Sequence, residues 1–235
     1  MPDAVPDAVL QAVPTRVAAV VPARNEADRV AATVRAVSTV PGVDLVVVVD
    51  DGSSDDTAAL ETGAGAVALW QERGEVPASG PWALLLVDAD LGEGAAACAA
   101  LTAPVLAGRL DMAVALAPDQ APGGEPGRAA ALVRRRAEAT SGWTPSQPLS
   151  RARCLTPQAL VAARPLARGA GVEAALTLDV LAAGYRVEEV PCALAPRAPA
   201  GGWRSRARGV GRYRDVARVV GARRLRARWA RWRSR

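Results

Sequence analysis

Residues 83–90, Ala-Leu-Leu-Leu-Val-Asp-Ala-Asp, join an apolar run to two carboxylates. The five apolar residues 83–87 have the length and composition of a strand that is buried on both faces. Asp88 and Asp90 follow where this strand ends, and ligands of open α/β sheets lie beyond the carboxyl ends of the strands. Two neighbouring carboxylates supply the hard oxygen ligands that Mg²⁺ or Mn²⁺ prefer. An isolated pair of this kind also occurs in solvated turns, so the rest of the chain decides between a cation site and a turn.

A second strand with an acidic end lies upstream. Residues 45–49 are one Leu and four Val, which is a strong strand pattern, and Asp50 and Asp51 follow them directly. Strand and helix patterns alternate along this half of the chain, so we predict a parallel sheet with crossover helices. Asp51 and Asp88 then lie at one edge of the sheet, at the carboxyl ends of neighbouring strands.

The other predicted elements continue this alternation. Val30, Val34 and Val37 share one face of the first predicted helix, which ends before Pro41. Further strands are predicted over residues 16–22, 110–117, 149–156 and 185–192, and further helices over 57–69, 93–108, 128–140 and 172–183.

The amino-acid composition limits which side chains can act as catalytic groups or metal ligands. The chain has no His, so no imidazole can act as a general base or bind a metal, and proton transfer falls to Asp and Glu. The cysteines Cys98, Cys154 and Cys192 lack the spacing of a zinc site or a disulfide framework, and we expect reduced, buried thiols of a cytoplasmic protein. Residues 1–13 carry no basic residue, so we expect no signal peptide, and no apolar run approaches the roughly 18 residues of a membrane span.

Charged residues are distributed unevenly along the chain. The net charge is +5, but residues 201–235 hold thirteen Arg and one acid, which gives them +12 and leaves −7 elsewhere. We divide the chain into an N-terminal extension (1–15), an α/β domain (16–200) and an Arg/Trp-rich helical segment (201–235). An acidic body with a basic tail indicates that the tail binds an anionic partner or surface.

Three partners are compatible with this basic segment. It can pack on the acidic body, lie on an anionic membrane surface, or bind nucleic acid. Val210, Tyr213, Val216, Val220 and Leu225 recur at near-helical spacing, so one face is apolar and the first part is expected to dock. We favour docking combined with peripheral contact at the inner face of the membrane. Nothing in the body of the chain supports nucleic acid.

Three motifs stand in a recognisable order. Residues 21–26 (VPARNE), 49–55 (VDDGSSD) and 88–91 (DADL) resemble the motifs of family 2 glycosyltransferases. The last has the form common among polyprenyl-phosphate sugar transferases of the dolichyl-phosphate mannose synthase type. Residues 169–173 (GAGVE) and 183–191 (AGYRVEEVP) are similar to the end of that catalytic domain. The resemblance implies a GT-A fold, with a mostly parallel sheet flanked by helices, and metal-dependent transfer of a sugar, with inversion, from a nucleoside-diphosphate sugar to an acceptor such as a polyprenyl phosphate.

The resemblance also implies roles at the matching positions. Asp88 and Asp90 would hold Mg²⁺ or Mn²⁺, Glu173 would be the catalytic carboxylate near the acceptor, and Asp179 is the reserve candidate. The donor nucleotide would contact Pro22, Arg24, Glu26, Asp50, Asp51, Ser53 and Asp88. Arg151 and Arg153 are further candidates for contact with the donor diphosphate.

The chain departs from the family pattern between the second and third motifs. A strand and a basic, Gly-rich stretch usually stand there, whereas Thr57 here leads directly into the predicted helix, so the segment is expected to be missing. The alternative function is therefore a catalytically degenerate GT-A protein that acts as a binding or scaffold module through its basic tail. A nucleotidyltransferase is a third interpretation, weakened by the lack of a Gly-rich, Lys-bearing loop near the N-terminus.

Overall fold

The computed structural model describes residues 13–70, 82–117, 127–167, 169–194, 211 and 213–223, and these residues form a seven-stranded mixed sheet. The strands are β1 (Arg16–Ala23), β2 (Val43–Asp50), β3 (Val67–Trp70), β4 (Trp82–Leu86), β5 (Met112–Leu116), β6 (Arg153–Leu155) and β7 (Val187–Pro191). Their order in the sheet is β3-β2-β1-β4-β6-β5-β7. All neighbouring strands are parallel except β6, which runs antiparallel to both β4 and β5. The mostly parallel α/β prediction is confirmed.

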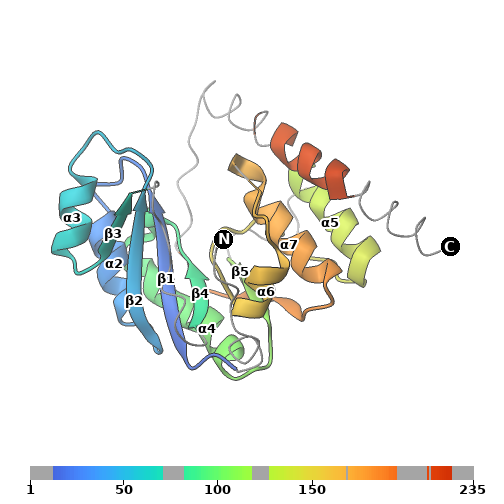
Figure 1. The fold of residues 1–235 in the computed structure, drawn as a ribbon, viewed down its shortest axis with the longest axis horizontal. Coiled ribbons are helices and arrows are strands. Elements are labelled where there is room, and N and C mark those ends of the chain that lie inside the picture. The colour runs from blue at the N-terminus through green and yellow to red at the C-terminus, as the bar shows by residue number, and fades with distance from the viewer. Residues whose placement is uncertain are drawn as a thin grey trace, which may run out of the picture.

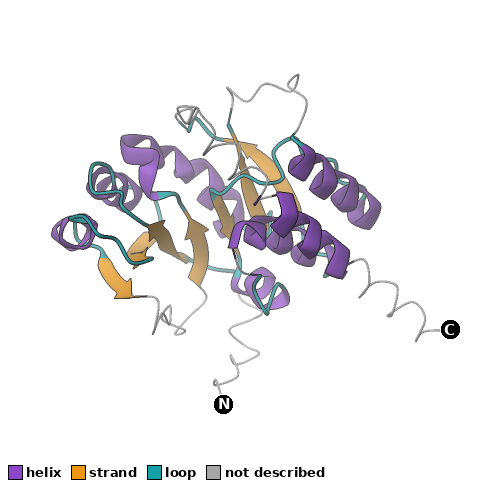
Figure 2. Ribbon diagram, turned by 90° about the horizontal axis from the view of Figure 1, so that it is seen from above, coloured by secondary structure: helices purple, strands orange, loops and turns teal. Residues whose placement is uncertain are grey.

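Helices cover both faces of this sheet (Figure 2). They are α2 (Val30–Ser38), α3 (Thr57–Gly63), the 3₁₀ helix η1 (Ala89–Cys98), α4 (Ala99–Leu106), α5 (Arg128–Ser141), α6 (Pro157–Ala162), the short 3₁₀ turn η2 (Gly169–Gly171) and α7 (Val172–Ala182). Helices α2, η1 and α4 pack into one core, and α5, α6 and α7 pack into the other.

The two cores follow from the alternation of side chains along the strands. Leu85 of β4 is fully buried in the core of α2, η1 and α4, whereas Leu84 and Leu86 pack against the core of α5, α6 and α7. The predicted helix face is also confirmed, because Val30, Val34 and Val37 are all fully buried.

The helix predicted over residues 57–69 is wrong in its second half. Helix α3 ends at Gly63, and β3 begins at Val67 and pairs in parallel with β2. A strand is therefore present after the second motif, and the prediction that it is missing is wrong. Residues 71–81, which follow it, lie outside the described residues, so the absence of the basic, Gly-rich stretch stays a prediction. Pairing with the edge of β2 supplies backbone hydrogen bonds that the Ala-rich sequence alone does not indicate.

Two other predicted boundaries and one predicted strand adjacency also differ from the structure. The helix predicted over 93–108 is η1 followed by α4, and Gly92 interrupts η1 with a φ of 57°. The strand predicted over 149–156 is only β6. Asp51 and Asp88 lie at one edge as predicted, but their strands are not neighbours, because β1 lies between β2 and β4.

Residues 213–223 form a helix that lies beside α5 and α7 (Figure 1). Val216 and Val220 are buried in the core of α5, α6 and α7, which confirms the predicted docking for this part of the segment. Tyr213, predicted to share the same face, is 41 % exposed, so that part of the prediction is wrong. Val210 and Leu225, predicted to share that apolar face, lie outside the described residues. None of the helices in the described part of the chain has both the length and the apolar character that spanning a bilayer requires.

Candidate functional site

A cleft of about 200 Å³ opens where β1, β2 and β4 end. Because these strands are parallel, their carboxyl ends meet at one edge of the sheet, which is where ligands of open α/β folds bind. The residues that line the cleft are Pro22, Ala23, Arg24, Glu26, Asp51, Asp88, Ala89, Asp90 and Arg151. The structure thus brings Asp51, Asp88 and Asp90 together on one side of the molecule.

The loop after β1 and the loop after β2 are joined by hydrogen bonds. Asn25, with a φ of 53°, donates its backbone N–H to Ser53 Oγ (3.0 Å) and accepts the Ser54 N–H at Oδ1 (2.8 Å). The backbone N–H of Glu26 donates to Thr57 Oγ1 at 2.9 Å. These contacts hold the first two sequence motifs against each other, so both loops present their side chains to one cleft.

Asp50 and Ser53 were predicted to bind the donor, but neither lines the cleft. Oδ1 of Asp50 accepts hydrogen bonds from Ser53 N (2.8 Å) and Ser53 Oγ (2.6 Å), and Asp50 is only 3 % exposed. This pair closes the turn that places Asp51 in the cleft. Arg24 Nη1 lies 3.5 Å from Asp51 Oδ2, and both side chains are more than half exposed.

Thr33 of α2 holds the loop that carries Asp88 and Asp90. Its hydroxyl donates to the carbonyl of Ala89 (2.6 Å) and accepts the N–H of Gly92 (2.8 Å), and Thr33 is fully buried. Arg29 Nη1 also donates to the carbonyl of Asp90 at 3.1 Å. The backbone around the two carboxylates is thus held by a side chain of α2 and by the side chain of the residue that precedes this helix.

Arg151 links Asp88 of the acidic motif to Glu173. Its Nε lies 2.9 Å from Asp88 Oδ1 and 3.6 Å from Glu173 Oε1. The Asp88 and Glu173 side chains are only 12 % and 14 % exposed. Glu173 does not itself line the cleft but reaches it through Arg151. In the described part of the chain, its buried Oε2 has no hydrogen-bond partner.

The reversed direction of β6 explains how Arg151 comes to lie beside Asp88. Arg153 is paired with Leu86 across the antiparallel β4–β6 ladder, so the first residues of β6 lie at the same edge as the last residues of β4. Arg151 precedes β6 and Asp88 follows β4, which places the two side chains together. Sequence analysis proposed Arg151 only as a further diphosphate ligand and did not predict its ion pairs.

Arg153 is a structural residue and does not reach the cleft. It is fully buried and donates from Nη1 to the Glu173 carbonyl (3.2 Å) and Thr177 Oγ1 (3.1 Å), and from Nη2 to the Ser150 carbonyl. Burial lowers the pKa of Arg153 to about 10, against the opposing effect of the nearby Glu173 charge. The side chain thereby fastens the start of α7 to the loop that carries Arg151.

Asp179, the reserve catalytic candidate, lies elsewhere. Its carboxylate pairs with Arg223 of the C-terminal helix, with Nε–Oδ1 at 2.8 Å and Nη2–Oδ2 at 2.5 Å, and it does not line the cleft. Six helical positions separate Asp179 from Glu173, so the two carboxylates cannot share one face of α7.

The cleft residues fit part of a site for a hard divalent cation. Asp88 and Asp90 offer carboxylate oxygens, which suit Mg²⁺ and Mn²⁺. Among the described residues, no group of three or more His, Cys, Asp or Glu side chains is placed to hold a metal ion. The donor set therefore suits a cation whose remaining ligands are phosphate oxygens and water, as is common for Mg²⁺.

No family model and no curated protein sequence matches the chain. Several solved structures do match. A glucosyl-3-phosphoglycerate synthase of Mycobacterium tuberculosis aligns with a TM-score of 0.69 and 22 % identity, over 88 % of this chain and 81 % of that one. The same enzyme with Mn²⁺, UDP-glucose and phosphoglyceric acid aligns with a TM-score of 0.66 and 23 % identity, over 89 % and 79 %. Its complex with Mn²⁺, UDP-glucose and glycerol 3-phosphate gives 0.67 and 22 %, over 89 % and 80 %.

These similarities establish the fold. The chain has the GT-A nucleotide-diphospho-sugar transferase fold, as the sequence resemblance implied. The fold alone does not determine the reaction, which depends on the residues of the cleft.

Proposed function

We propose that this protein is an inverting glycosyltransferase that transfers a sugar from a nucleoside-diphosphate donor to a phosphorylated acceptor with the aid of Mg²⁺ or Mn²⁺. The observation that carries the proposal is the cleft itself, where the ends of three parallel strands gather Asp51, Asp88 and Asp90 with Arg24 and Arg151. The GT-A fold supports the same reaction class, and the solved synthases with this fold are described with Mn²⁺ and UDP-glucose.

The residues of the cleft have distinct roles in this proposal. Pro22, Arg24, Glu26 and Asp51 contact the nucleoside, because they come from the two interlocked loops beyond β1 and β2. Asp88 and Asp90 hold the cation, which when bound neutralises the charge that develops on the leaving diphosphate. Asp50 and Ser53 act through the turn that positions Asp51.

Glu173 is the proposed acceptor-side carboxylate. It lies in the first turn of α7, and its contact with Arg151 places it within reach of the cleft. If the reacting group is a hydroxyl, Glu173 accepts its proton as the anomeric bond forms, which requires hydrogen-bond reach in the complex. A phosphate acceptor is already an anion, and Glu173 then orients Arg151.

The acceptor is proposed to be phosphorylated. Two sources share this chemistry, a polyprenyl phosphate and a small phosphorylated acid, and the M. tuberculosis synthases are described with phosphoglyceric acid and glycerol 3-phosphate. Incubation with radiolabelled UDP-glucose or GDP-mannose and each acceptor separates them, because lipid product partitions into organic solvent and the small product stays in water.

Contact with an anionic membrane surface is proposed for the helix of residues 213–223. Its apolar residues Val216 and Val220 face the core, which leaves Tyr213, Arg214 and Arg218 exposed. Basic residues near a membrane each contribute about 1 kcal/mol to binding of anionic lipid. Co-sedimentation with phosphatidylglycerol vesicles, but not with phosphatidylcholine vesicles, would support this contact, and equal recovery with both would contradict it.

A thermal-shift experiment tests the central proposal. Mn²⁺ with UDP or GDP should raise the melting temperature of the wild type, and Asp90→Ala should lose this response, because only a ligand that binds the folded state stabilises it. Asp44→Asn is the matched control, since Asp44 lies near the opposite end of β2 and pairs with Arg16. The absence of any shift with either nucleotide would contradict the transferase and favour the scaffold function.

A further inference from the structure

Arg151 joins two carboxylates that the proposed reaction uses, Asp88 and Glu173. We propose that Arg151 makes binding of the divalent cation depend on binding of the donor diphosphate. It neutralises Asp88 in the free protein and pairs with the diphosphate when donor and cation bind together. This inference rests on the proposed function and adds a role that neither the fold nor the three motifs assign.

The first step of the argument is competition at Asp88. Its Oδ1 already lies 2.9 Å from the guanidinium Nε of Arg151, and only 12 % of the Asp88 side chain is exposed. Charges that are partly removed from water interact more strongly than exposed ones. A divalent cation that approaches Asp88 alone therefore meets a positive charge at the same carboxylate, and its affinity is reduced.

The second step is the new partner that a diphosphate offers. A guanidinium binds phosphate oxygens through two parallel hydrogen bonds, a geometry that suits Arg better than Lys. The Arg151 side chain is 40 % exposed and lines the cleft beside Asp90. It can therefore reach a ligand in the cleft. The negative charges of a diphosphate offset the positive charges of the cation and of Arg151 together. The cation and Arg151 then no longer compete for Asp88.

The third step concerns the backbone that carries Arg151. Buried Arg153 donates hydrogen bonds to the carbonyls of Ser150 and Glu173, so the residue before Arg151 is fastened to the start of α7. The loop is held in place while the Arg151 side chain extends into the cleft. The guanidinium thus changes partners by side-chain rotation, without a change in the fold.

The coupling between binding of the cation and binding of the diphosphate is reciprocal. If the diphosphate raises the affinity for the cation by some factor, the cation raises the affinity for the diphosphate by the same factor. Removal of the Arg151 charge should weaken this coupling, since Asp88 is then available to the cation whether or not a donor is bound. Donor affinity should fall at the same time, because one phosphate contact is lost.

The test measures Mn²⁺ binding through the electron paramagnetic resonance signal of free Mn²⁺, with and without saturating UDP, after correction for the Mn²⁺ that UDP binds in protein-free solution. Wild type should bind Mn²⁺ at least about tenfold more tightly with UDP than without it, a typical size for coupling between sites. Arg151→Gln should bind Mn²⁺ alone several-fold more tightly than wild type, so the gain in Mn²⁺ affinity on addition of UDP should be several-fold smaller than in wild type. Arg151→Lys, which retains the charge, should keep the weak binding of Mn²⁺ alone.

Arg35→Gln is the matched control. Arg35 is exposed on α2 and lies outside the cleft, and its substitution by Gln removes the same charge as Arg151→Gln. Its Mn²⁺ affinities should equal those of wild type. If wild type binds Mn²⁺ with UDP and Arg151→Gln shows unchanged affinity and coupling, the inference is wrong while the proposed function stands. If wild type binds neither Mn²⁺ nor UDP, both are wrong. Thermal unfolding of each variant verifies that the comparison is between folded proteins.

Discussion

Arg223 holds Asp179 in a two-point ion pair, with the guanidinium Nε 2.8 Å from Oδ1 and Nη2 2.5 Å from Oδ2. The side chains are only 13 % and 18 % exposed, so most of this pair is removed from water. It connects the helix of residues 213–223 to α7, beside the buried contacts of Val216 and Val220. The carboxylate that sequence analysis kept as a reserve catalytic group therefore stabilises the docked C-terminal helix.

Asp179→Asn should lower the free energy of unfolding by about 2–3 kcal/mol, because it leaves Arg223 largely buried without its counter-charge. Sugar transfer at a temperature where the variant is folded should stay near the wild-type rate. Asp215→Asn is the control, since its pair with Arg218 is exposed and should contribute less than about 1 kcal/mol. Urea denaturation checks the stability. A large loss of kcat with unchanged stability would instead assign Asp179 to catalysis.

Gly171→Ala should also weaken the docking of this helix. A Cβ at Gly171 would lie 2.8 Å from Val219 Cγ2 and 3.2 Å from the carbonyl oxygen of Asp215, and the backbone atom cannot move alone. Overpacking of this kind costs about 1–3 kcal/mol. Gly63→Ala, where nothing lies within 4 Å of the added carbon, should be neutral or slightly stabilising. Equal melting temperatures for the two variants would contradict the predicted close packing.

Much of the fold could be predicted because its patterns are local. The runs that became β1, β2 and β4 are continuous and apolar, and the spacing of Val30, Val34 and Val37 is helical. β3 could not be predicted, because residues 67–70 have no pattern that excludes a helix and form a strand only through their pairing with β2. The short antiparallel β6 is likewise determined by its two neighbours in the sheet.

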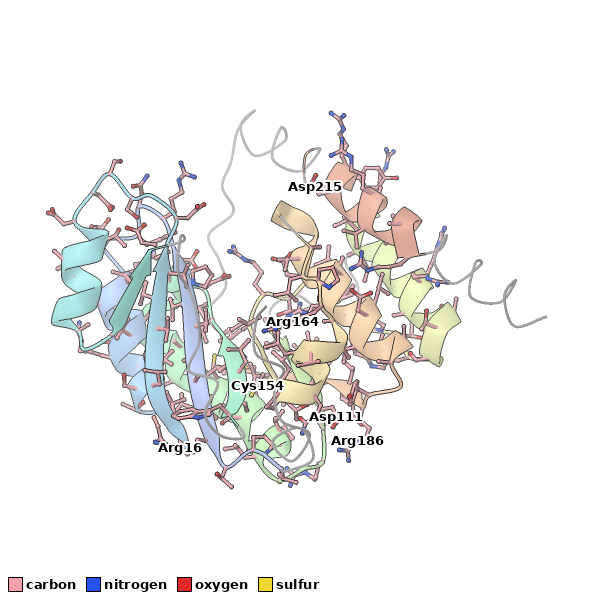
Figure 3. The ribbon with its side chains drawn as sticks, in the orientation of Figure 1. Arg16, Asp111, Cys154, Arg164, Arg186 and Asp215 are labelled. Atoms are coloured by element: carbon pink, nitrogen blue, oxygen red, sulfur yellow. The ribbon has the colours of Figure 1, made fainter. Side chains whose placement is uncertain are left out.

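Asp111→Asn should destabilise the protein at neutral pH and have little effect in acid. Burial raises the pKa of Asp111, but the hydrogen bonds and charge of Arg186 outweigh it, so the pKa lies below its usual value. Figure 3 shows the two side chains together; Arg186 donates from Nε (3.0 Å), Nη2 (3.1 Å) and its backbone N (2.8 Å).

A lowered carboxyl pKa contributes stability that is fully present above the unfolded value of about 3.9 and is lost as pH falls through the native value. Arg186 is 57 % exposed, so solvent screening limits the expected loss in Asp111→Asn to about 1 kcal/mol at pH 7. Urea denaturation at pH 7 and pH 2.5 measures it. A difference from wild type that is as large at pH 2.5 as at pH 7 would contradict the ionic origin.

The three cysteines should be unreactive in the folded protein. All are buried, burial raises the pKa of Cys154 to about 12, and a hydrogen bond with Cys192 followed by burial raises the pKa of Cys98. The reactive thiolate of Cys98 and Cys154 is therefore scarce at pH 8. The hydrogen bond with Cys98 lowers the pKa of Cys192, but Cys192 is only 2 % exposed, so burial protects it from the reagent. A chromogenic disulfide reagent should label no thiol quickly in native protein and three per chain in guanidinium chloride. Fast labelling of one native thiol would contradict the buried arrangement.

The candidate site was predicted where it depends on strand ends and was missed where it depends on contacts between distant segments. Asp51, Asp88 and Asp90 could be placed because a parallel sheet brings carboxyl ends to one edge. The ion pairs of Arg151 could not, because they require the antiparallel direction of β6 and the position of α7. Asp50 was predicted correctly in position, at the end of β2, but its carboxylate closes a turn.

Thr33→Val should disturb the proposed cation site without a change in any residue that lines the cleft. The Thr33 hydroxyl is fully buried and bonds to both the Ala89 carbonyl and the Gly92 N–H, so a methyl group of the same shape removes both hydrogen bonds. The expected cost is about 1–3 kcal/mol of stability. Because Ala89 lies between Asp88 and Asp90, the affinity for Mn²⁺ with UDP should also fall severalfold.

Thr39→Val is the control for this prediction. The exposed Thr39 hydroxyl donates to the Ala36 carbonyl at the end of α2, so its loss should change neither the stability nor the Mn²⁺ affinity appreciably. Unchanged Mn²⁺ affinity in a measurably destabilised Thr33→Val variant would show that the backbone around the two carboxylates is held by other contacts.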